Sequence, residues 1–536
     1  MDAPSVLSVM GKKWETSMWI KFDHVQEAKR YRMLEKKLTS NGTAIYPGLL
    51  LQRAARDYPE IAALIVGERE ISYRELYERV CYFATTLRSG GIRAGDRVLI
   101  CFENVPEFYV AYYAVWHLGA VVTPLNTFLH EKELAHVVKD ASASHVITAS
   151  DRVDAFTKHD GLKKEHIFTE ADIAIDGPVS ANSLDETIAE IPVDQMAALL
   201  YTSGTTGLPK GVMLSGTNII TSILQGASRL PFQRERVLGV LPLFHSFAQS
   251  ICLWCAVHTG STVILVKKID RRRILDGLAH RPTAVLGVPA LYGLFCLLRA
   301  EPMEQVRIFV SGGDALPDRI RSIFGLLYRR KLCNGYGLTE TSPFISVDLE
   351  GVFEPTSNVG NPMHGVEVKI TDEEGKLTPG KTGLLWVRGA NVMLGYYNAP
   401  DETAKVLVDG WLNTGDLAYI DEHGKVVITG RLKDLIINKG LNIYPQEIEN
   451  VIVSHSNVLR VGVVGRQHDT EGEIPVAFVQ LRKTQENVEA ELKALCSQHL
   501  APYKVPRSFI CSTEQLEVTA TGKVDKKVLR KRLSES

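Results

Sequence analysis

The segment YTSGTTGLPKG, residues 201–211, restricts what this chain can be more than any other feature of its sequence. It follows the apolar run AALLYT at residues 197–202, which predicts a strand. Residues 202–210 alone hold two Gly, three Thr, one Ser and one Lys, a composition that a simple surface turn does not need. Small residues let backbone N–H groups approach phosphate oxygens, hydroxyl groups add donors, and Lys210 adds a positive charge. The segment therefore predicts a polyphosphate-binding loop, and the missing GK[ST] disfavours a P-loop kinase or ATPase.

The length of the chain predicts how many domains it has, and its net charge predicts how it can bind a charged ligand. With 536 residues, of which 45% are apolar, the chain exceeds the size at which a single core stops growing, so we expect more than one domain. The 61 basic and 62 acidic residues nearly cancel. No overall field attracts nucleic acid, so any charged ligand must be held by a local site.

The eight cysteines are scattered and mostly lie in apolar segments, which favours a reducing, cytoplasmic compartment. Cys252 and Cys255 form a C-x-x-C within the apolar segment ICLWCAVHTG, and no second pair accompanies them. We therefore interpret them as core residues rather than as a redox or zinc site.

The N-terminal region has no apolar run of signal-peptide type, and an acidic residue appears at Glu15. The longest apolar stretches, residues 111–125 and 251–266, are broken before they reach membrane-spanning length. Residues 22–38 predict a basic helix with one apolar face, formed by Val25, Ala28, Tyr31 and Leu34. We expect this face to pack on a larger domain. The alternative is a helix that lies on a membrane surface, peripheral to the bilayer.

Most of the chain alternates short apolar runs with helical patterns, which predicts an α/β class with layered, largely parallel sheets. One helix should begin after Ser72, with Glu75 in capping-box spacing, and end at Gly90. Further strands are expected at residues 97–102, 145–148, 197–202, 261–266, 284–288 and 307–312. From about residue 365, short strands and Gly-rich turns predict an antiparallel or barrel-like subdomain.

After Arg431 the pattern becomes a compact α+β unit. Its helices are expected at residues 445–453 and 488–499, and its strands near residues 459–464 and 476–480. We therefore divide the chain into an N-terminal extension at residues 1–45, a large domain at residues 46–432, and a small C-terminal domain at residues 433–536.

The phosphate loop and a series of later motifs resemble the adenylate-forming superfamily of acyl-CoA synthetases, luciferases and peptide-synthetase adenylation domains. The similarity runs from about Tyr46 to Leu533. The resemblance implies a large adenylation domain, a small mobile C-terminal domain, and ATP with Mg²⁺ as the nucleotide. It also implies that the triphosphate is bound by Thr202, Ser203, Gly204, Thr205, Thr206, Gly207 and Lys210.

The segment NGYGLTET, residues 334–341, resembles a second motif of that superfamily. There Tyr336 would stack on adenine, Thr339 would touch the α-phosphate, and Glu340 would bind Mg²⁺, which prefers hard carboxylate oxygens. Asp416 would bind the ribose hydroxyls, with Arg431 beside it. The adenine edge would be met by Gly312, Gly313, Asn334, Gly335 and Gly337.

The C-terminal motifs imply a moving domain. Lys433 matches the hinge position of the superfamily, while Lys439 and Gly440 would face the thiol donor in the second half-reaction. Lys523, in TATGK, would be the catalytic lysine. By analogy its ammonium bridges the attacking carboxylate and the α-phosphate, which stabilises the charge of the transition state.

The segment LPLFHSFA, residues 241–248, resembles the motif that lines the acyl site, with His245 near the carboxylate. Amino-acid-activating relatives tend to carry an Asp here, and this segment has none, so an apolar acid is expected. Phe247, Leu253 and Trp254 are candidates for the wall of a fatty-acyl tunnel or for plain core. Ser215 and Gly216 stand where relatives usually carry His or Asn, which puts the substrate-side contacts in doubt.

These features predict an AMP-forming acid–thiol ligase that joins a fatty acid to coenzyme A or to the phosphopantetheine of acyl carrier protein. A ligase for aryl or amino acids is one alternative. A nucleotide-binding scaffold without catalysis is another, but retention of Glu340, Asp416, Arg431 and Lys523 together argues against it.

Overall fold

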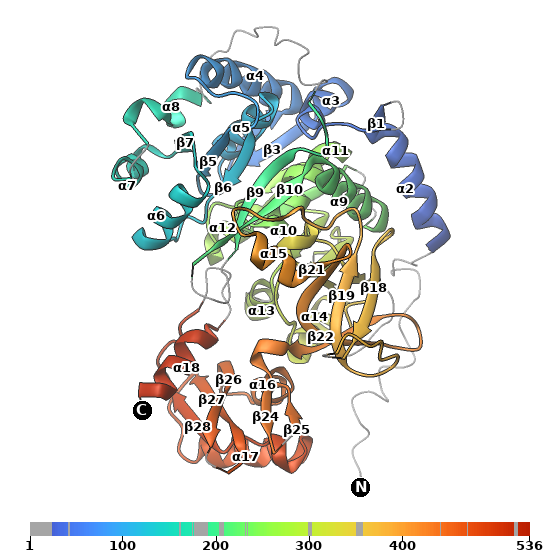
Figure 1. The fold of residues 1–536 in the computed structure, drawn as a ribbon, viewed down its shortest axis with the longest axis vertical. Helices are drawn as coiled ribbons and strands as arrows, with labels where there is room; N and C mark the ends of the chain where they lie inside the picture. The colour runs from blue at the N-terminus through green and yellow to red at the C-terminus, as the bar shows by residue number, and fades with distance from the viewer. Residues whose placement is uncertain are drawn as a thin grey trace.

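The computed structural model describes residues 24–40, 43–159, 162–173, 175, 191–202, 208–230, 232, 234–298, 303–349, 357–372, 374–439, 441–468, 470–518 and 524–535. Within these ranges the chain forms a large N-terminal part of layered sheets and helices, and a small C-terminal part that follows β23 (Figure 1). The predicted α/β class with a large and a small domain is confirmed.

The first large sheet carries the predicted phosphate loop. Its strands β5 to β9 are mutually parallel, and β10 then runs antiparallel to β9. In sheet order the strands are β20 (Gly395–Tyr396), β10 (Lys210–Ser215), β9 (Met196–Thr202), β6 (Val121–Pro124), β5 (Arg97–Cys101), β7 (His145–Thr148) and β8 (Ile167–Phe168).

The second large sheet carries the predicted adenine motifs at its parallel centre. In sheet order its strands are β17 (Asn361–Pro362), β16 (Ser346–Asp348), β15 (Cys333–Tyr336), β14 (Ile308–Ser311), β13 (Ala284–Gly287), β11 (Arg236–Gly239), β12 (Thr262–Leu265), β3 (Ala62–Val66) and β4 (Arg69–Ser72). Because parallel strands end at one edge of a sheet, the loops after β13, β14 and β15 lie together.

Helix α5 (Pro106–His117) joins the two sheets. Apart from Glu107 in its first turn, every residue of the helix is buried, as a helix between layers must be. The hydroxyls of its three tyrosines donate hydrogen bonds to oxygen atoms of the segment Gln249–Cys255. The Trp116 indole donates to the Ala197 carbonyl of β9. The core therefore couples the strand before the phosphate loop to the segment after the acyl motif.

Other helices cover the two sheets or connect their strands. Helix α4 begins after Ser72, whose hydroxyl accepts from the Glu75 amide at 3.1 Å, and ends at Gly90, as predicted. The helices are α3 (Leu49–Asp57), α4 (Tyr73–Ser89), α6 (Glu131–Asp140), α7 (Val153–Thr157), α8 (Glu170–Ile173), α9 (Gly216–Arg229), α10 (Ser246–Ala248), α11 (Ala256–Thr259), α12 (Arg271–Ala279), α13 (Pro289–Leu298), α14 (Asp318–Tyr328) and α15 (Pro400–Val406).

An antiparallel sheet follows from residue 367 onward, as predicted. It places Asp416 and Arg431 opposite each other on neighbouring strands. Its strands are β18 (Glu367–Thr371), β19 (Gly383–Arg388), β21 (Leu407–Val408), β22 (Trp411–Ile420) and β23 (Val426–Arg431).

The basic N-terminal helix, α2 (His24–Leu38), packs on α9 (Figure 1) and is followed by the short strands β1 (Thr39–Ser40) and β2 (Thr43–Ala44). Tyr31 and Leu34 pack against the main core, which agrees with the preferred interpretation. The predicted face is wrong at Val25, which is 61% exposed. Glu27 is buried in its place, because its carboxylate pairs with Arg229 of α9 at 2.7 Å.

The small C-terminal part has apolar clusters of its own. Helices α16 and α17 have the predicted bounds, and the two long strands extend beyond theirs. Its elements are β24 (Ile436–Asn438), β25 (Leu441–Ile443), α16 (Pro445–Val453), β26 (Val458–His468), β27 (Gly472–Leu481), α17 (Val488–His499), β28 (Ser508–Ser512) and α18 (Lys526–Glu535).

The eight cysteines are free thiols, and Cys252 and Cys255 lie in the main core. Burial raises the pKa of both thiols, that of Cys252 to about 12, so they are poor nucleophiles and metal ligands. This supports their interpretation as core residues. Among the described helices, none combines the length and the apolar composition that crossing a membrane requires.

Candidate active site

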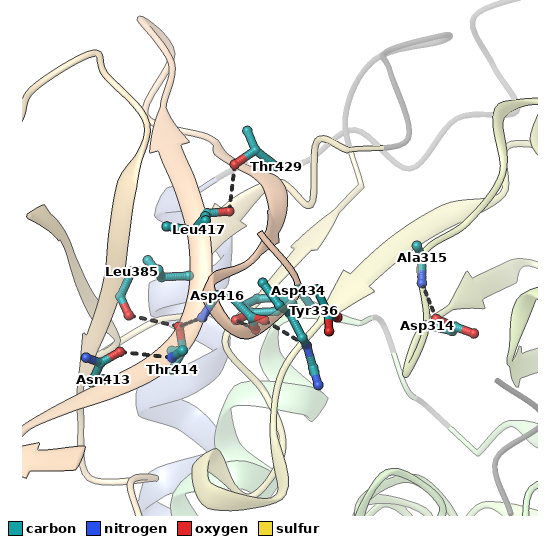
Figure 2. Close-up of polar contacts among 12 residues, drawn as sticks. Asp314, Ala315, Tyr336, Leu385, Asn413, Thr414, Asp416, Leu417, Thr429 and Asp434 are labelled. Atoms are coloured by element: carbon teal, nitrogen blue, oxygen red, sulfur yellow. Dashed lines mark hydrogen bonds and ion pairs between the residues drawn. The ribbon is translucent and has the colours of Figure 1, made fainter. Parts of the chain in front are cut away.

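The predicted ribose and adenine residues meet where the second large sheet approaches the antiparallel sheet. Tyr336 ends β15, and its hydroxyl donates to Asp416 of β22 at 2.5 Å. Arg431, opposite on β23, contacts the other carboxylate oxygen through Nε at 3.0 Å. Figure 2 shows the Tyr336 and Asp416 side chains lying together, with Thr414 accepting from the Asp416 amide. The three predicted residues therefore form one polar cluster.

The electrostatics of this cluster keep each group in the form that recognition of a nucleotide requires. Burial raises the pKa of Tyr336 well above its usual range, and the Asp416 carboxylate raises it further, so the phenol stays protonated and donates. The same carboxylate raises the pKa of Arg431. Asp416 is only 3% exposed, so these two partners, rather than water, satisfy its carboxylate oxygens.

Two glycines allow the chain to pass closely at the predicted adenine edge. A Cβ at Gly312, after β14, would lie 3.3 Å from the Phe247 ring and 3.4 Å from the carbonyl oxygen of Gly335. A Cβ at Gly337 would lie 1.5 Å from the carbonyl oxygen of Pro343, so no other residue fits there. Gly313 has a φ of +77°, and Asn334 is buried on β15 as the register partner of Ser311. The adenine motifs thus lie against the acyl motif through Phe247.

Glu340 and Thr339 follow Tyr336 in the turn Thr339–Thr341. The Thr339 hydroxyl lies 3.1 Å from that of Ser246, next to His245, the N-cap of α10. The Glu340 carboxylate accepts from the Tyr396 hydroxyl at 2.9 Å through Oε1. One hard oxygen held in this way, with substrate phosphates as the remaining ligands, fits the manner in which proteins bind Mg²⁺ with a nucleotide.

The phosphate loop begins and ends at paired residues, because Thr202 of β9 is the register partner of Lys210 of β10. Lys210 Nζ pairs with Glu402 at 2.5 Å and lies 5.4 Å from the centre of the Tyr396 ring. Residues Ser203, Gly204, Thr205, Thr206 and Gly207 lie outside the described residues. A continuous set of contacts thus runs from the loop through Tyr396 to Glu340.

Of the predicted hinge and thiol-side residues, Lys433 lies in the turn after β23, and Lys439 lies in the small part directly after β24. Lys433 is in the turn Leu432–Asp434, where burial lowers its pKa, and its carbonyl lies 3.4 Å from the Arg530 guanidinium of α18. Lys439 has a φ of +49° and lies 3.4 Å from Glu471. Gly440 and Lys523 lie outside the described residues.

Packing explains two features of the acyl side: the role of Leu253 and Trp254, and the presence of Ser215 and Gly216 where relatives carry His or Asn. Leu253 and Trp254 are fully buried in the main core, and the Trp254 indole donates to Tyr112, so they are core residues. Ser215 caps α9 by accepting from the Asn218 amide. A Cβ at Gly216 would lie 2.6 Å from the Val193 carbonyl oxygen. The departure from the usual His or Asn therefore has a structural explanation.

Tyr396 and Glu402 are site residues that the sequence did not reveal. They follow β19 by a short loop, and no phosphate- or metal-type pattern marks them. Only the pairing of β20 with β10, which aligns Tyr396 with Val212, brings them to Lys210 and Glu340.

Comparisons with known proteins agree with this arrangement. The AMP-binding enzyme model matches residues 51–397, and the AMP-binding enzyme C-terminal domain model matches residues 447–523. A long-chain-fatty-acid–CoA ligase of Bacillus subtilis is 32% identical over 91% of this chain and 93% of its own. A feruloyl-CoA synthase of an Amycolatopsis species is 34% identical over 90% of this chain and 97% of its own.

Solved structures agree as well. ATP-bound MatB from Rhodopseudomonas palustris superposes with a TM-score of 0.80 at 30% identity, covering 90% of this chain and 98% of its own. The o-succinylbenzoate CoA synthetase of Bacillus subtilis, in complex with ATP and magnesium ion, has a TM-score of 0.80 at 29% identity, covering 90% and 99%. By its two matching models and its near full-length relatives, the chain belongs to the AMP-binding enzyme family of the adenylate-forming superfamily.

Proposed function

We propose that this protein uses MgATP to convert a fatty acid into an acyl-adenylate and then passes the acyl group to the thiol of coenzyme A or of carrier-bound phosphopantetheine. One observation carries the proposal. The Tyr336–Asp416–Arg431 cluster and the Lys210–Tyr396–Glu340 contacts come from distant segments, yet they converge on the turn that joins Tyr336 to Glu340. The first suits a nucleoside, and the second suits a magnesium polyphosphate.

In the first half-reaction, a carboxylate oxygen of the acid attacks the α-phosphorus, and the bond to the β-phosphate oxygen breaks. Acyl-AMP forms and pyrophosphate leaves. Asp416 binds the ribose, Thr339 binds the α-phosphate, and Glu340 would hold the Mg²⁺ that neutralises the phosphates. Lys523 brings its ammonium between the two like-charged reactants, where the charge of the transition state develops.

In the second half-reaction, the thiol attacks the acyl carbon, loses its proton, and AMP leaves as a phosphate monoester. The small domain turns about Lys433, which removes Lys523 from the site and brings Lys439 and Gly440 to the thiol donor. We expect His245 to act beside the acyl carboxylate, because the Thr339–Ser246 contact ties its loop to the residue proposed to bind the α-phosphate.

The names of the relatives indicate two classes of acid substrate, fatty acids and aryl acids. A fatty acid is the first choice because residues 241–248 offer no acidic partner for an amino group, and Phe247 presents an apolar ring next to Gly312. An aryl acid is the second, because the feruloyl-CoA synthase is similar over nearly the whole chain.

A panel of acids and thiols tests the proposal. Fatty acids of increasing length, aryl acids and amino acids are each supplied with ATP, Mg²⁺ and either coenzyme A or phosphopantetheinylated carrier protein, and AMP and thioester are measured. We expect AMP and thioester in equal amounts with fatty acids and coenzyme A. If only aryl or amino acids give product, the fatty-acid assignment is wrong. If no acid leads to release of AMP, the non-catalytic scaffold is favoured.

A further inference from the structure

Tyr396 connects two groups that the proposed chemistry uses separately, the Glu340 carboxylate and the Lys210 ammonium. We propose that Tyr396 is a positioning residue for the magnesium nucleotide: its hydroxyl orients Glu340 toward the metal, and its ring supports Lys210 beside the phosphates. This inference rests on the proposed function and adds a residue that no motif of the sequence indicated.

The main chain around Tyr396 is fixed from both sides. Residues 394–397 add to β10, with the Leu394 amide donating to Met213 and the Tyr397 amide donating to Gly211. The Tyr396 amide donates to the Thr403 hydroxyl at 2.8 Å. A side chain on such a frame is placed more precisely than one on a free loop.

The same segment holds Glu340 twice. The Met393 amide donates to the Glu340 carbonyl at 2.9 Å, and the Tyr396 hydroxyl donates to Glu340 Oε1 at the same distance. A hydrogen bond at one carboxylate oxygen fixes the direction of the other, which is how outer partners orient the ligands of a metal.

Lys210 is held by two contacts of different kinds. Its ammonium lies over the Tyr396 ring and pairs with Glu402, whose other oxygen pairs with Lys405 at 2.5 Å. Lys210 is 21% exposed at its side chain, whereas Lys405 is 68% exposed. When a phosphate attracts Lys210, Lys405 still neutralises Glu402, so the exchange leaves no unpaired carboxylate.

Tyr396→Phe tests the hydroxyl, and Tyr397→Phe is its matched control at the next residue, just after the end of β20. The rate of acid-dependent exchange of labelled pyrophosphate into ATP is measured against Mg²⁺ concentration. We expect Tyr396→Phe to need about 10–100-fold more Mg²⁺ for half-maximal rate and to recover at high Mg²⁺. Tyr397→Phe should match the parent. An unchanged Mg²⁺ requirement in Tyr396→Phe, or an equal shift in the control, overturns the proposal.

A double-mutant cycle separates loss of the Tyr396–Glu340 contact from a nonspecific effect of the substitution on folding or activity. On a Glu340→Gln background the tyrosine substitution should change the Mg²⁺ requirement by less than about twofold, because coupled residues are non-additive. Full additivity overturns the proposal. Tyr396→Leu removes the ring as well and should raise the KM for ATP beyond that of Tyr396→Phe; equal values overturn the role of the ring. If the parent protein shows no exchange with any acid, the proposed function itself is rejected.

Discussion

At the scale of single residues, Asp416 is a buried carboxylate that needs two donors from other strands. It is almost fully buried, and it accepts from the Tyr336 hydroxyl while pairing with Arg431. A carboxylate in this position is stable only because both donors are present. The two contacts fix the direction of the Asp416 carboxylate within the cluster.

Replacing Asp416 by Ala should therefore affect binding and stability together. The partly buried Tyr336 hydroxyl loses its acceptor, which costs about 1–3 kcal/mol of unfolding free energy. The KM for ATP should rise about tenfold or more, because a charge-assisted hydrogen bond to a ribose is worth about 1.5–3 kcal/mol. Denaturant unfolding and steady-state kinetics measure the two effects.

Asp314→Ala is the control for this variant, because Asp314 is exposed on the turn after β14 (Figure 2). It should leave both the unfolding free energy and the KM for ATP near the parent values. A normal KM in Asp416→Ala would contradict the role given to this carboxylate.

Lys523 allows a second prediction, because it is proposed to act in the first half-reaction and to leave the site before the second. Lys523→Ala should slow formation of acyl-AMP by about 10²–10³-fold, the usual cost of removing one transition-state partner. Transfer from supplied acyl-AMP to the thiol should stay within a few-fold. Lys527→Ala, on α18, is the matched control. Full adenylation activity in Lys523→Ala would refute the proposed catalytic lysine.

At the scale of elements, α2 is attached by a buried ion pair. Glu27 and Arg229 are each about 2% exposed, and Arg229 also donates to the Pro362 carbonyl, so α2, α9 and β17 share one guanidinium. Tyr31 adds a contact to His364, with ring centroids 4.4 Å apart. The helix is therefore part of the large domain, and its exposed lysines and arginines form its outer face.

Glu27→Ala should destabilise the protein by about 3–5 kcal/mol, because it strands a buried arginine. Glu35→Ala, on the exposed face of the same helix, should change the unfolding free energy by less than about 0.5 kcal/mol. Equilibrium unfolding in denaturant compares the two. Equal, small effects would mean that α2 is detached in solution.

Sequence reasoning reached local structure more easily than long-range register. Strand β7 and helices α16 and α17 were predicted at their observed bounds, because β-branched runs and capping signals are local. The contacts of Tyr396 with Glu340, and of Glu402 with Lys210, span 56 and 192 residues. They depend on which strand β20 joins, and nothing in the residues 395–402 specifies that partner. Similarly, the buried position of Glu27 depends on Arg229, which is far away in the sequence.

At the scale of the whole molecule, the two parts meet through an arginine. Arg319 of α14 donates to the carbonyl groups at the end of α16, closest to His455 at 3.1 Å. A guanidinium at a helix C-terminus satisfies carbonyls that the helix leaves unpaired and favours the negative end of its dipole. A small domain that alternates between two orientations must break this contact.

Arg319→Ala should weaken the observed orientation. We expect faster amide hydrogen exchange at residues 454–458 and a changed ratio of the two half-reaction rates, with the melting temperature of the large domain unchanged. Arg330→Ala, which removes a contact to the Glu304 carbonyl within the large domain, is the control. Identical exchange in both variants would contradict a role for Arg319 in domain orientation.

The most direct test of the account is acid-dependent exchange of labelled pyrophosphate into ATP. The convergence of Lys210, Glu340 and Asp416 predicts that exchange requires both Mg²⁺ and a carboxylic acid, and that fatty acids support it best. ATP turnover that proceeds without an acid, or that yields ADP in place of AMP, would contradict the central claim.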